Sequence, residues 1–194
     1  MYLSIPYDSV DLNNIFIGNK KQNNILKTCY FSNIYYSNSK FSLNNIVIHF
    51  NIHHIHKYEL INDVLHAYFL NDDKFINYQT FSILSKIEEN ILNQYKSIYP
   101  NRTIQNNIFQ LFHKKCIRLS SMKKYNNIKN TTTNDNFVDI STNTINNNIT
   151  STTIDSNIIN KKLNDNTIKC IIRISGIWEN ENQKIGLIYK FMYV

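Results

Sequence analysis

Alternation of apolar and polar positions is clearest over residues 40–52. One face of an extended chain there would carry Ile46, Ile48, Phe50 and Ile52, and the other Val47, His49, Asn51 and His53. Residues two apart share a strand face, so the pattern predicts a half-buried strand with a polar outer face. Residues 29–37 predict a second strand, and the segment SNSK between the two is a plausible hairpin turn.

A helical period replaces this alternation at residues 81–97. Its apolar stripe consists of Ile83, Leu84, Ile87, Ile91, Leu92 and Tyr95. Spacings of three and four residues predict one amphipathic helix, with Thr80 as its N-cap and Pro100 beyond its end.

Four further segments have shorter patterns. Residues 1–18 are rich in β-favouring apolar side chains and are expected to be extended. Residues 58–70 follow helical spacing and predict a short helix, with a pair of strands as the alternative. Residues 104–112 predict a second short helix, and a strand is expected to begin within 116–119.

Both patterns disappear between residues 120 and 166, where Asn, Thr, Ser, Lys and Asp surround single isoleucines. Such a segment buries too little apolar surface to offset the entropy lost on ordering. We therefore expect a disordered, low-complexity insert. Order returns at Thr167, and the remaining strands must pair with earlier ones to be stable.

The stretch from Thr167 to the end predicts a β-hairpin around the turn NENQ. One strand would carry Cys170, Ile172, Ile174 and Trp178 on a single face, and the other Leu187, Tyr189, Phe191 and Tyr193. Arg173 and Lys190 mark where the opposite face reaches water. Gly176 and Gly186 are expected where the sheet bends or is closely approached, and Trp178 is expected to anchor the core.

These elements predict an α+β fold: an antiparallel sheet, with a barrel-like form as one option, and one main helix. Residues 1–119 and 167–194 would form a single domain that the insert at 120–166 interrupts. The chain has 194 residues, of which 42% are hydrophobic, and this length and composition are sufficient for one hydrophobic core.

The net charge of +7 and a pI near 9.2 favour an anionic partner. Nucleic acid, an acidic protein and a membrane surface all meet that description, and a lysine-rich solvated surface is the alternative. No apolar run approaches the about 20 residues that span a bilayer, so we expect no membrane partner. The three cysteines are far apart and the N-terminus lacks a signal peptide, which predicts an intracellular protein with reduced thiols.

Candidate catalytic and metal-binding residues are sparse. His49, His53, His54 and His56 form the densest cluster, but zinc normally takes three or four ligands that include carboxylates or thiolates, and no such spacing is present. The chain has three glycines and lacks phosphate-binding loops and nucleophile motifs. We expect a non-enzymatic protein with no cofactor and no metal.

Aromatic and basic residues interleave, as in proteins that stack and hold single-stranded nucleic acid. The candidate contact residues are Tyr30, Tyr35, Tyr36, Lys40, Lys114, Lys115, Arg118 and Lys190. Core packing is the alternative for the three tyrosines, and a solvated edge for the basic run. Four other aromatic residues are expected in the core, namely Phe31, Phe50, Trp178 and Phe191.

Two stretches carry a resemblance, CYFSNIYYSNSKFSLNNIVIHF and IIRISGIWENENQKIGLIYKF. With the central SKIEENILNQY, they resemble a family of small uncharacterised proteins of nucleocytoplasmic large DNA viruses. The resemblance covers residues 12–119 and 167–194 and implies a role in the host cytoplasm or the virion. It implies no catalytic residue.

Two functions follow as hypotheses. The first is binding of single-stranded DNA or RNA during viral replication or transcription. The second is a structural or assembly role, in which the sheet edge or the C-terminal hairpin docks another viral protein.

Overall fold

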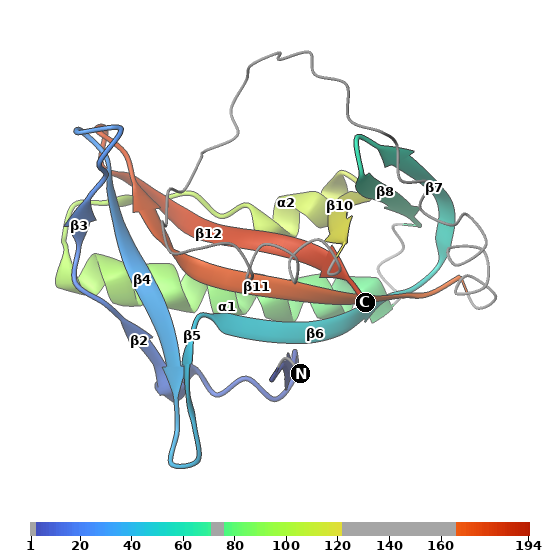
Figure 1. Cartoon of the computed structure of the whole chain (residues 1–194), viewed down its shortest axis with the longest axis horizontal. Coiled ribbons are helices and arrows are strands. Elements are labelled where there is room, and N and C mark those ends of the chain that lie inside the picture. Colours follow the sequence, from blue (N-terminus) through green and yellow to red (C-terminus); the bar gives the residue numbers. More distant parts are fainter. Residues whose placement is uncertain (1–2, 71–75, 122–165) are drawn as a thin grey trace, which may run out of the picture.

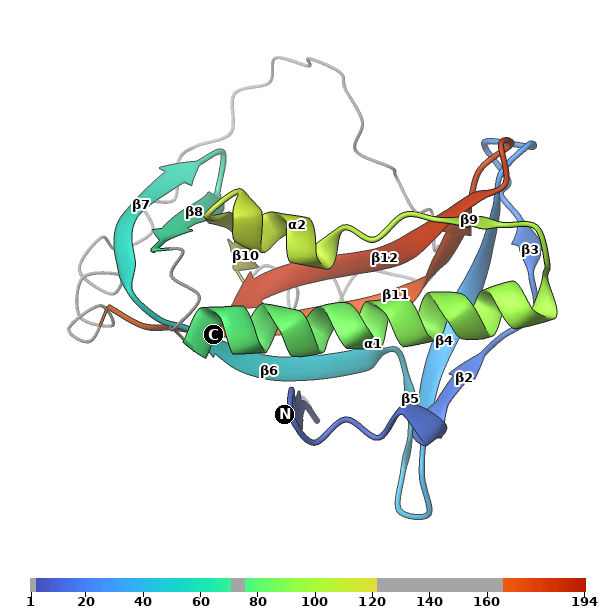
Figure 2. The same cartoon turned by 180° about the vertical axis from the view of Figure 1, so that it is seen from behind.

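The computed structural model describes residues 3–70, 76–121 and 166–194. The insert expected at 120–166 therefore lies almost entirely outside the described residues. The helices α1 (Ile76–Ile98) and α2 (Ile108–His113) lie on the same side of a large sheet (Figures 1 and 2). We call that side the helix face, and the opposite side, on which neither helix lies, the helix-free face. No helix in the described ranges is long and apolar enough to cross a membrane.

The C-terminal hairpin forms the centre of the sheet. Its strands, β11 (Ile168–Glu179) and β12 (Lys184–Tyr193), pair with each other and with strands from the first part of the chain. The order across the sheet is β1 (Ile5–Pro6), β6 (Ile46–Ile52), β11, β12, β10 (Cys116–Ser121), β8 (Val64–Phe69) and β7 (Ile55–Ile61). Strands on both sides of the insert thus share one sheet.

A smaller arm branches from the far end of β11, where β4 (Tyr30–Ser37) takes the place of β6. Strand β4 also pairs with β2 (Ile15–Ile17), β3 (Lys21–Gln22) and β5 (Ser42–Asn44), and β9 (Thr103–Ile104) pairs with β12. A turn of 3₁₀ helix, Leu12–Asn14, leads into β2. The expected hairpin at SNSK is the β4–β5 connection, which projects beyond the sheet in Figure 1.

The sheet is mixed and open, so the antiparallel, barrel-like prediction is only partly right. Strand β1 runs parallel to β6, and both β9 and β10 run parallel to β12. These parallel partners are far apart in the sequence, where no hairpin turn imposes an antiparallel direction. In the described part of the chain, β1 and β7 end the order without pairing with each other.

The hydrophobic core lies between the sheet and α1. The predicted alternation in β6 is confirmed, because Ile46, Ile48, Phe50 and Ile52 are all buried. Asn45, with φ of 89°, separates β5 from β6 and so divides the single strand that the sequence predicted. The predicted faces of the return strand also hold: Leu187 and Phe191 are buried, and Tyr189 and Tyr193 pack against the core.

Helix α1 confirms the strongest helical prediction but begins earlier, at Ile76. Thr80 is therefore a buried residue within the helix and not its N-cap. Buried Asn77 instead ties this end of the helix to the β6–β7 connection. Its side-chain oxygen accepts from the His53 amide at 2.8 Å, and its side-chain nitrogen donates to the His53 carbonyl at 2.6 Å.

Residues 58–70 do not form the predicted helix. They belong to the β7–β8 hairpin, which was the alternative. Asn62 and Asp63 occupy its turn with φ of 50° and 62°, a left-handed conformation that these short polar side chains tolerate. The predicted helix at 104–112 is shorter, since Ile104 lies in β9 and α2 begins at Ile108. The strand expected within 116–119 is β10.

Candidate nucleic-acid interface

Three basic residues lie side by side on the helix-free face of the central strands. Arg173 on β11 is directly opposite Lys190 on β12. On the other side of β12, Ser120 and Ser121 of β10 pair with Met192 and Tyr193, and Arg118 lies two residues before this pairing on the same face of β10 as Ser120. We call Arg118, Lys190 and Arg173 the basic row. Paired strands are about 4.8 Å apart, so Arg173 and Lys190 are immediate neighbours, and Arg118 adds a third positive charge on the strand next to Lys190.

The neighbouring strands extend this row on one side. His66 on β8 is opposite Arg118, and Glu59 on β7 is opposite His66. Glu59 is already engaged by Lys57 at 2.7 Å and by the Tyr68 hydroxyl at 3.0 Å. The Glu59 carboxylate therefore contacts residues of β7 and β8, at the edge of the sheet, and not the basic row. Like charges placed directly opposite each other repel across a pair of strands.

Trp178 lies on the helix-free face, contrary to the predicted face pattern. The register of β11 against β12 shifts between Ile174 and Gly176, which marks a β-bulge at Ser175. One extra residue reverses the alternation, so that Ile174 faces the helices and Trp178 faces away. The bulge therefore moves the only tryptophan of the chain onto the same face as the basic row.

A second row crosses the sheet at Trp178. Its cross-strand neighbour on β4 is Phe31, and Lys21 on β3 is opposite Phe31. We call Lys21, Phe31 and Trp178 the aromatic row. Among the described residues, the hydrophobic core contains Phe50 and Phe191, as predicted, but neither Phe31 nor Trp178. Both rings are half-buried and lie on the helix-free face.

Two glycines make this arrangement possible. A β-carbon at Gly186 would lie 2.6–2.8 Å from three atoms of the Trp178 indole, so the ring leans across the sheet onto the bare backbone of β12. A β-carbon at Gly176 would lie 2.6 Å from the Ser32 carbonyl oxygen, so the bulge depends on glycine as well. The prediction that these glycines mark close approaches is confirmed.

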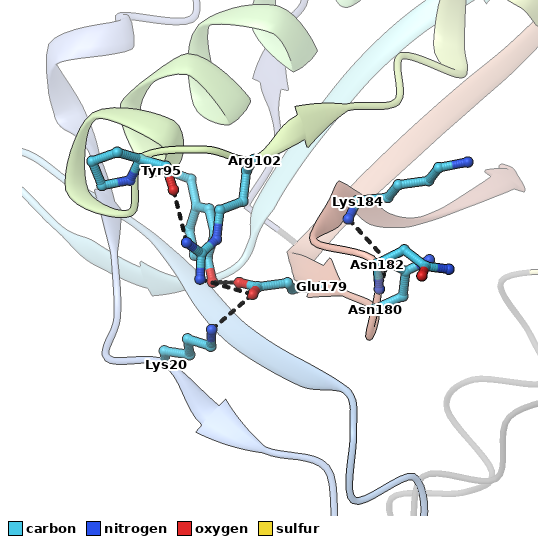
Figure 3. A network of polar contacts seen from close by, with 8 residues as sticks. Lys20, Tyr95, Arg102, Glu179, Asn180, Asn182 and Lys184 are labelled. Carbon is cyan, nitrogen blue, oxygen red and sulfur yellow. Dashed lines mark hydrogen bonds and ion pairs between the residues drawn. The ribbon is translucent and has the colours of Figure 1, made fainter.

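Glu179, next to Trp178, is held on the helix face by a polar network (Figure 3). Its carboxylate accepts hydrogen bonds from Lys20 at 2.8 Å, Arg102 at 3.0 Å and the Tyr95 hydroxyl at 2.8 Å. The Glu179 side chain is only 4% exposed, and the two cations 18% each. Adjacent strand residues point to opposite faces, so this anchor also directs Trp178 to the helix-free face.

The electrostatics of the network favour an ionised Glu179. Burial alone would raise the pKa of Glu179, but the hydrogen bonds from Lys20, Tyr95 and Arg102 outweigh it and hold this pKa below its ordinary value. Burial and the hydrogen bond to Glu179 raise the pKa of Tyr95, so its hydroxyl remains a donor.

The predicted contact residues are dispersed, and only Arg118 and Lys190 lie in the basic row. Tyr30 faces the helices, with the Lys20 ammonium 4.0 Å from its ring centroid. Tyr36 is buried and packs against Phe41.

The other four lie elsewhere on the surface. Tyr35 is on the opposite side of β4 from Tyr30, and Lys40 is in the projecting β4–β5 turn. Lys114 and Lys115 are exposed where α2 gives way to β10. The candidate contact residues predicted from the sequence do not include Arg173, Phe31 and Trp178, because the cross-strand register that places them on this face is not readable from local pattern.

The histidine run is distributed over both sides of the β6–β7 connection. The rings of His49 and His53 are engaged by the hydroxyls of Ser4 and Thr167, at 3.0 and 3.2 Å. Burial lowers the pKa of His53. Within the described ranges, no group of three or more His, Cys, Asp or Glu side chains could hold a metal ion.

Comparison with protein-family models, curated proteins and solved structures finds no match for this chain. The interface is therefore defined by geometry alone.

Proposed function

We propose that the helix-free face binds single-stranded nucleic acid and that the protein acts as a binding protein without catalysis. The observation that carries this proposal is the basic row, in which Arg173 and Lys190 are directly opposite each other and Arg118 lies on the adjacent strand β10. The phosphates of a nucleic-acid backbone are attracted to closely spaced Lys and Arg side chains of this kind.

A single strand fits this face better than a duplex. Duplex readers insert a helix or a narrow ribbon into a groove, whereas the basic row lies on the broad surface of a sheet. Open sheet surfaces with basic and aromatic side chains hold single strands by backbone charge and base stacking.

The test is fluorescence anisotropy of a labelled oligothymidylate, with Lys190→Glu as the site variant. Lys86→Glu is the matched control, because Lys86 is an exposed residue of α1, on the other face, and the change in net charge is the same. We expect Lys190→Glu to weaken binding about tenfold and Lys86→Glu to leave it nearly unchanged. Equal losses would show that net charge, and not this face, determines affinity.

Salt dependence measures the number of phosphate contacts. Log affinity falls with log salt by about 0.7 per phosphate contact on a single strand. Arg118→Ala should reduce this slope by about that amount between roughly 50 and 200 mM salt. Absence of binding at the lower salt concentration would refute the proposal.

We also propose that this binding serves viral replication or transcription in the host cytoplasm. The support is the sequence resemblance of residues 12–119 and 167–194. Imaging the tagged protein in infected cells tests this role: we expect it to colocalise with newly made viral nucleic acid, and a uniform distribution would contradict the proposal.

One observation favours a second candidate function, docking of a protein at the sheet edge. Strand β7 ends the sheet order in the described residues, and its Leu60 and Ile61 are each 44% exposed. By contrast, both strands of the C-terminal hairpin lie inside the sheet order, with partner strands on either side. The docking site would therefore be β7.

The charged residues of β7 are arranged so that the strand can pair with β7 of a second copy of the chain. Antiparallel pairing of two β7 strands about Tyr58 would place Lys57 of each copy opposite Glu59 of the other, and such opposite charges stabilise cross-strand pairs. Sedimentation should then detect a dimer that Glu59→Lys weakens. A monomer at all accessible concentrations would remove this candidate.

A further inference from the structure

Trp178 differs from the core aromatic residues in its position on the sheet and in its neighbours. It lies on the helix-free face, outside the hydrophobic core of the described residues, with Phe31 beside it on β4. Its indole leans over Gly186, where a β-carbon would approach the ring atoms to 2.6–2.8 Å. One side of the ring is thus against the backbone, and the other side is directed away from the sheet.

Two features hold the ring in this position. The bulge at Ser175 sets the direction of the Trp178 side chain, and the ion pairs of Glu179 with Lys20 and Arg102 fix the next residue on the helix face. A rigid aromatic ring loses little conformational freedom when a second ring stacks on it. The site is therefore preorganised for a planar ligand.

The two rows are at a separation that one nucleic-acid strand can span. Gly186 under the indole and Lys190 of the basic row are four residues apart on β12. At about 3.3 Å per residue, this separation is roughly 13 Å along the strand. A chain whose phosphates contact the basic row can therefore place a nearby base over Trp178.

We propose that Trp178 is a base-stacking platform, on which an unpaired nucleobase packs against the outward side of the indole. This proposal rests on the proposed function and deepens it, because it assigns base contact to the aromatic row and phosphate contact to the basic row. The ligand class is a single strand with unpaired bases. Stacking is tolerant of base identity, so little sequence preference is expected.

The experiment uses the fluorescence of Trp178, which is the only tryptophan in the 194-residue chain. The 194-residue protein is titrated with oligothymidylate and, separately, with an abasic oligomer of the same length. Binding is followed in parallel by anisotropy of a label on each oligomer. We expect oligothymidylate to quench the tryptophan emission and the bound abasic oligomer to leave it nearly unchanged.

Three variants test the platform directly. Trp178→Ala should weaken oligothymidylate binding about tenfold and leave binding of the abasic oligomer unchanged. Trp178→Phe, which keeps a flat ring, should restore most of the lost affinity. Gly186→Ala should displace the indole and reduce quenching, and circular dichroism establishes that each variant is folded.

The outcomes separate the two proposals. Binding of both oligomers without quenching, or equal quenching by both, overturns the platform and leaves the proposed function intact. Weakening of oligothymidylate and abasic binding to the same extent by Trp178→Ala also overturns it. Absence of binding in the anisotropy measurement overturns both proposals together.

Discussion

Arg173 and Lys190 occupy directly opposite positions on β11 and β12, with both side chains on the helix-free face. Lys190→Glu would place an opposite charge across from Arg173. We expect it to raise the free energy of unfolding by about 0.5 kcal/mol, whereas the proposed function predicts weaker nucleic-acid binding by the same variant. Urea denaturation at low salt provides the measurement. A loss of stability would show that other groups of the chain already neutralise the pair.

Glu179 should be a major determinant of stability. Glu179→Gln leaves Lys20 and Arg102 partly buried without their carboxylate, at an expected cost of about 3 kcal/mol. The pKa of this carboxyl is lowered in the folded protein, so its contribution is present above the ordinary value of 4.5 and lost as the pH falls through the lowered pKa. The difference between wild type and Glu179→Gln in urea denaturation should therefore shrink below pH 4.5. A difference that does not vary with pH would contradict this account.

Glu88 should show the opposite trend with pH. It is fully buried on α1 and accepts hydrogen bonds from the amides of Asn107 and Ile108, at 3.1 and 2.9 Å. Burial nevertheless raises its pKa, so the stability this group contributes is present below the ordinary value of 4.5 and lost as the pH rises through the raised pKa. The free energy of unfolding of Glu88→Gln, relative to wild type, should increase from about pH 4 to about pH 7. Chemical denaturation across this range provides the check, and a flat difference would exclude a raised pKa.

The bulge should be intolerant of a side chain at Gly176. Gly176→Ala forces a β-carbon to within 2.6 Å of the Ser32 carbonyl, which belongs to the backbone of a paired strand. We expect a loss of about 2 kcal/mol in thermal or urea unfolding. Gly18→Ala is the control, because its nearest neighbour, at 3.0 Å, is the ring of Tyr35, a side chain that can move. Similar costs for the two substitutions would argue against a specific need for glycine at the bulge.

Local pattern was sufficient for most of the secondary structure. The apolar residues of β6 and α1 are buried in the core between the sheet and the helix. Their spacing in the sequence therefore indicates a strand and a helix directly. The segment 58–70 was misjudged because Leu60, Ile61, Val64 and Leu65 fit a helical period as well as a hairpin. The turn residues Asn62 and Asp63 decided in favour of the hairpin.

The candidate interface was predictable only in part. The sequence points to Arg118 through the basic run before the insert and to Lys190 through the interleaving of aromatic and basic residues. Their alignment with Arg173 depends on pairing between strands far apart in sequence. Trp178 was assigned to the wrong face because a bulge leaves no mark in the hydrophobic pattern; the glycine at position 176 was its only local sign.

The central position of β11 and β12 has a consequence for the order of events during synthesis. Strands β6 and β10 emerge from the ribosome early, yet neither pairs with the other, and both pair with strands made much later. Within the first 121 residues, β6 pairs with β1 and β10 pairs with β8, but β11 and β12 lie between these two parts of the sheet. The joined sheet must therefore wait for residues 168–193. Such non-local topology slows folding. During that delay, the apolar edges of β6 and β10 are vulnerable to aggregation, and chaperones are expected to engage the nascent chain there.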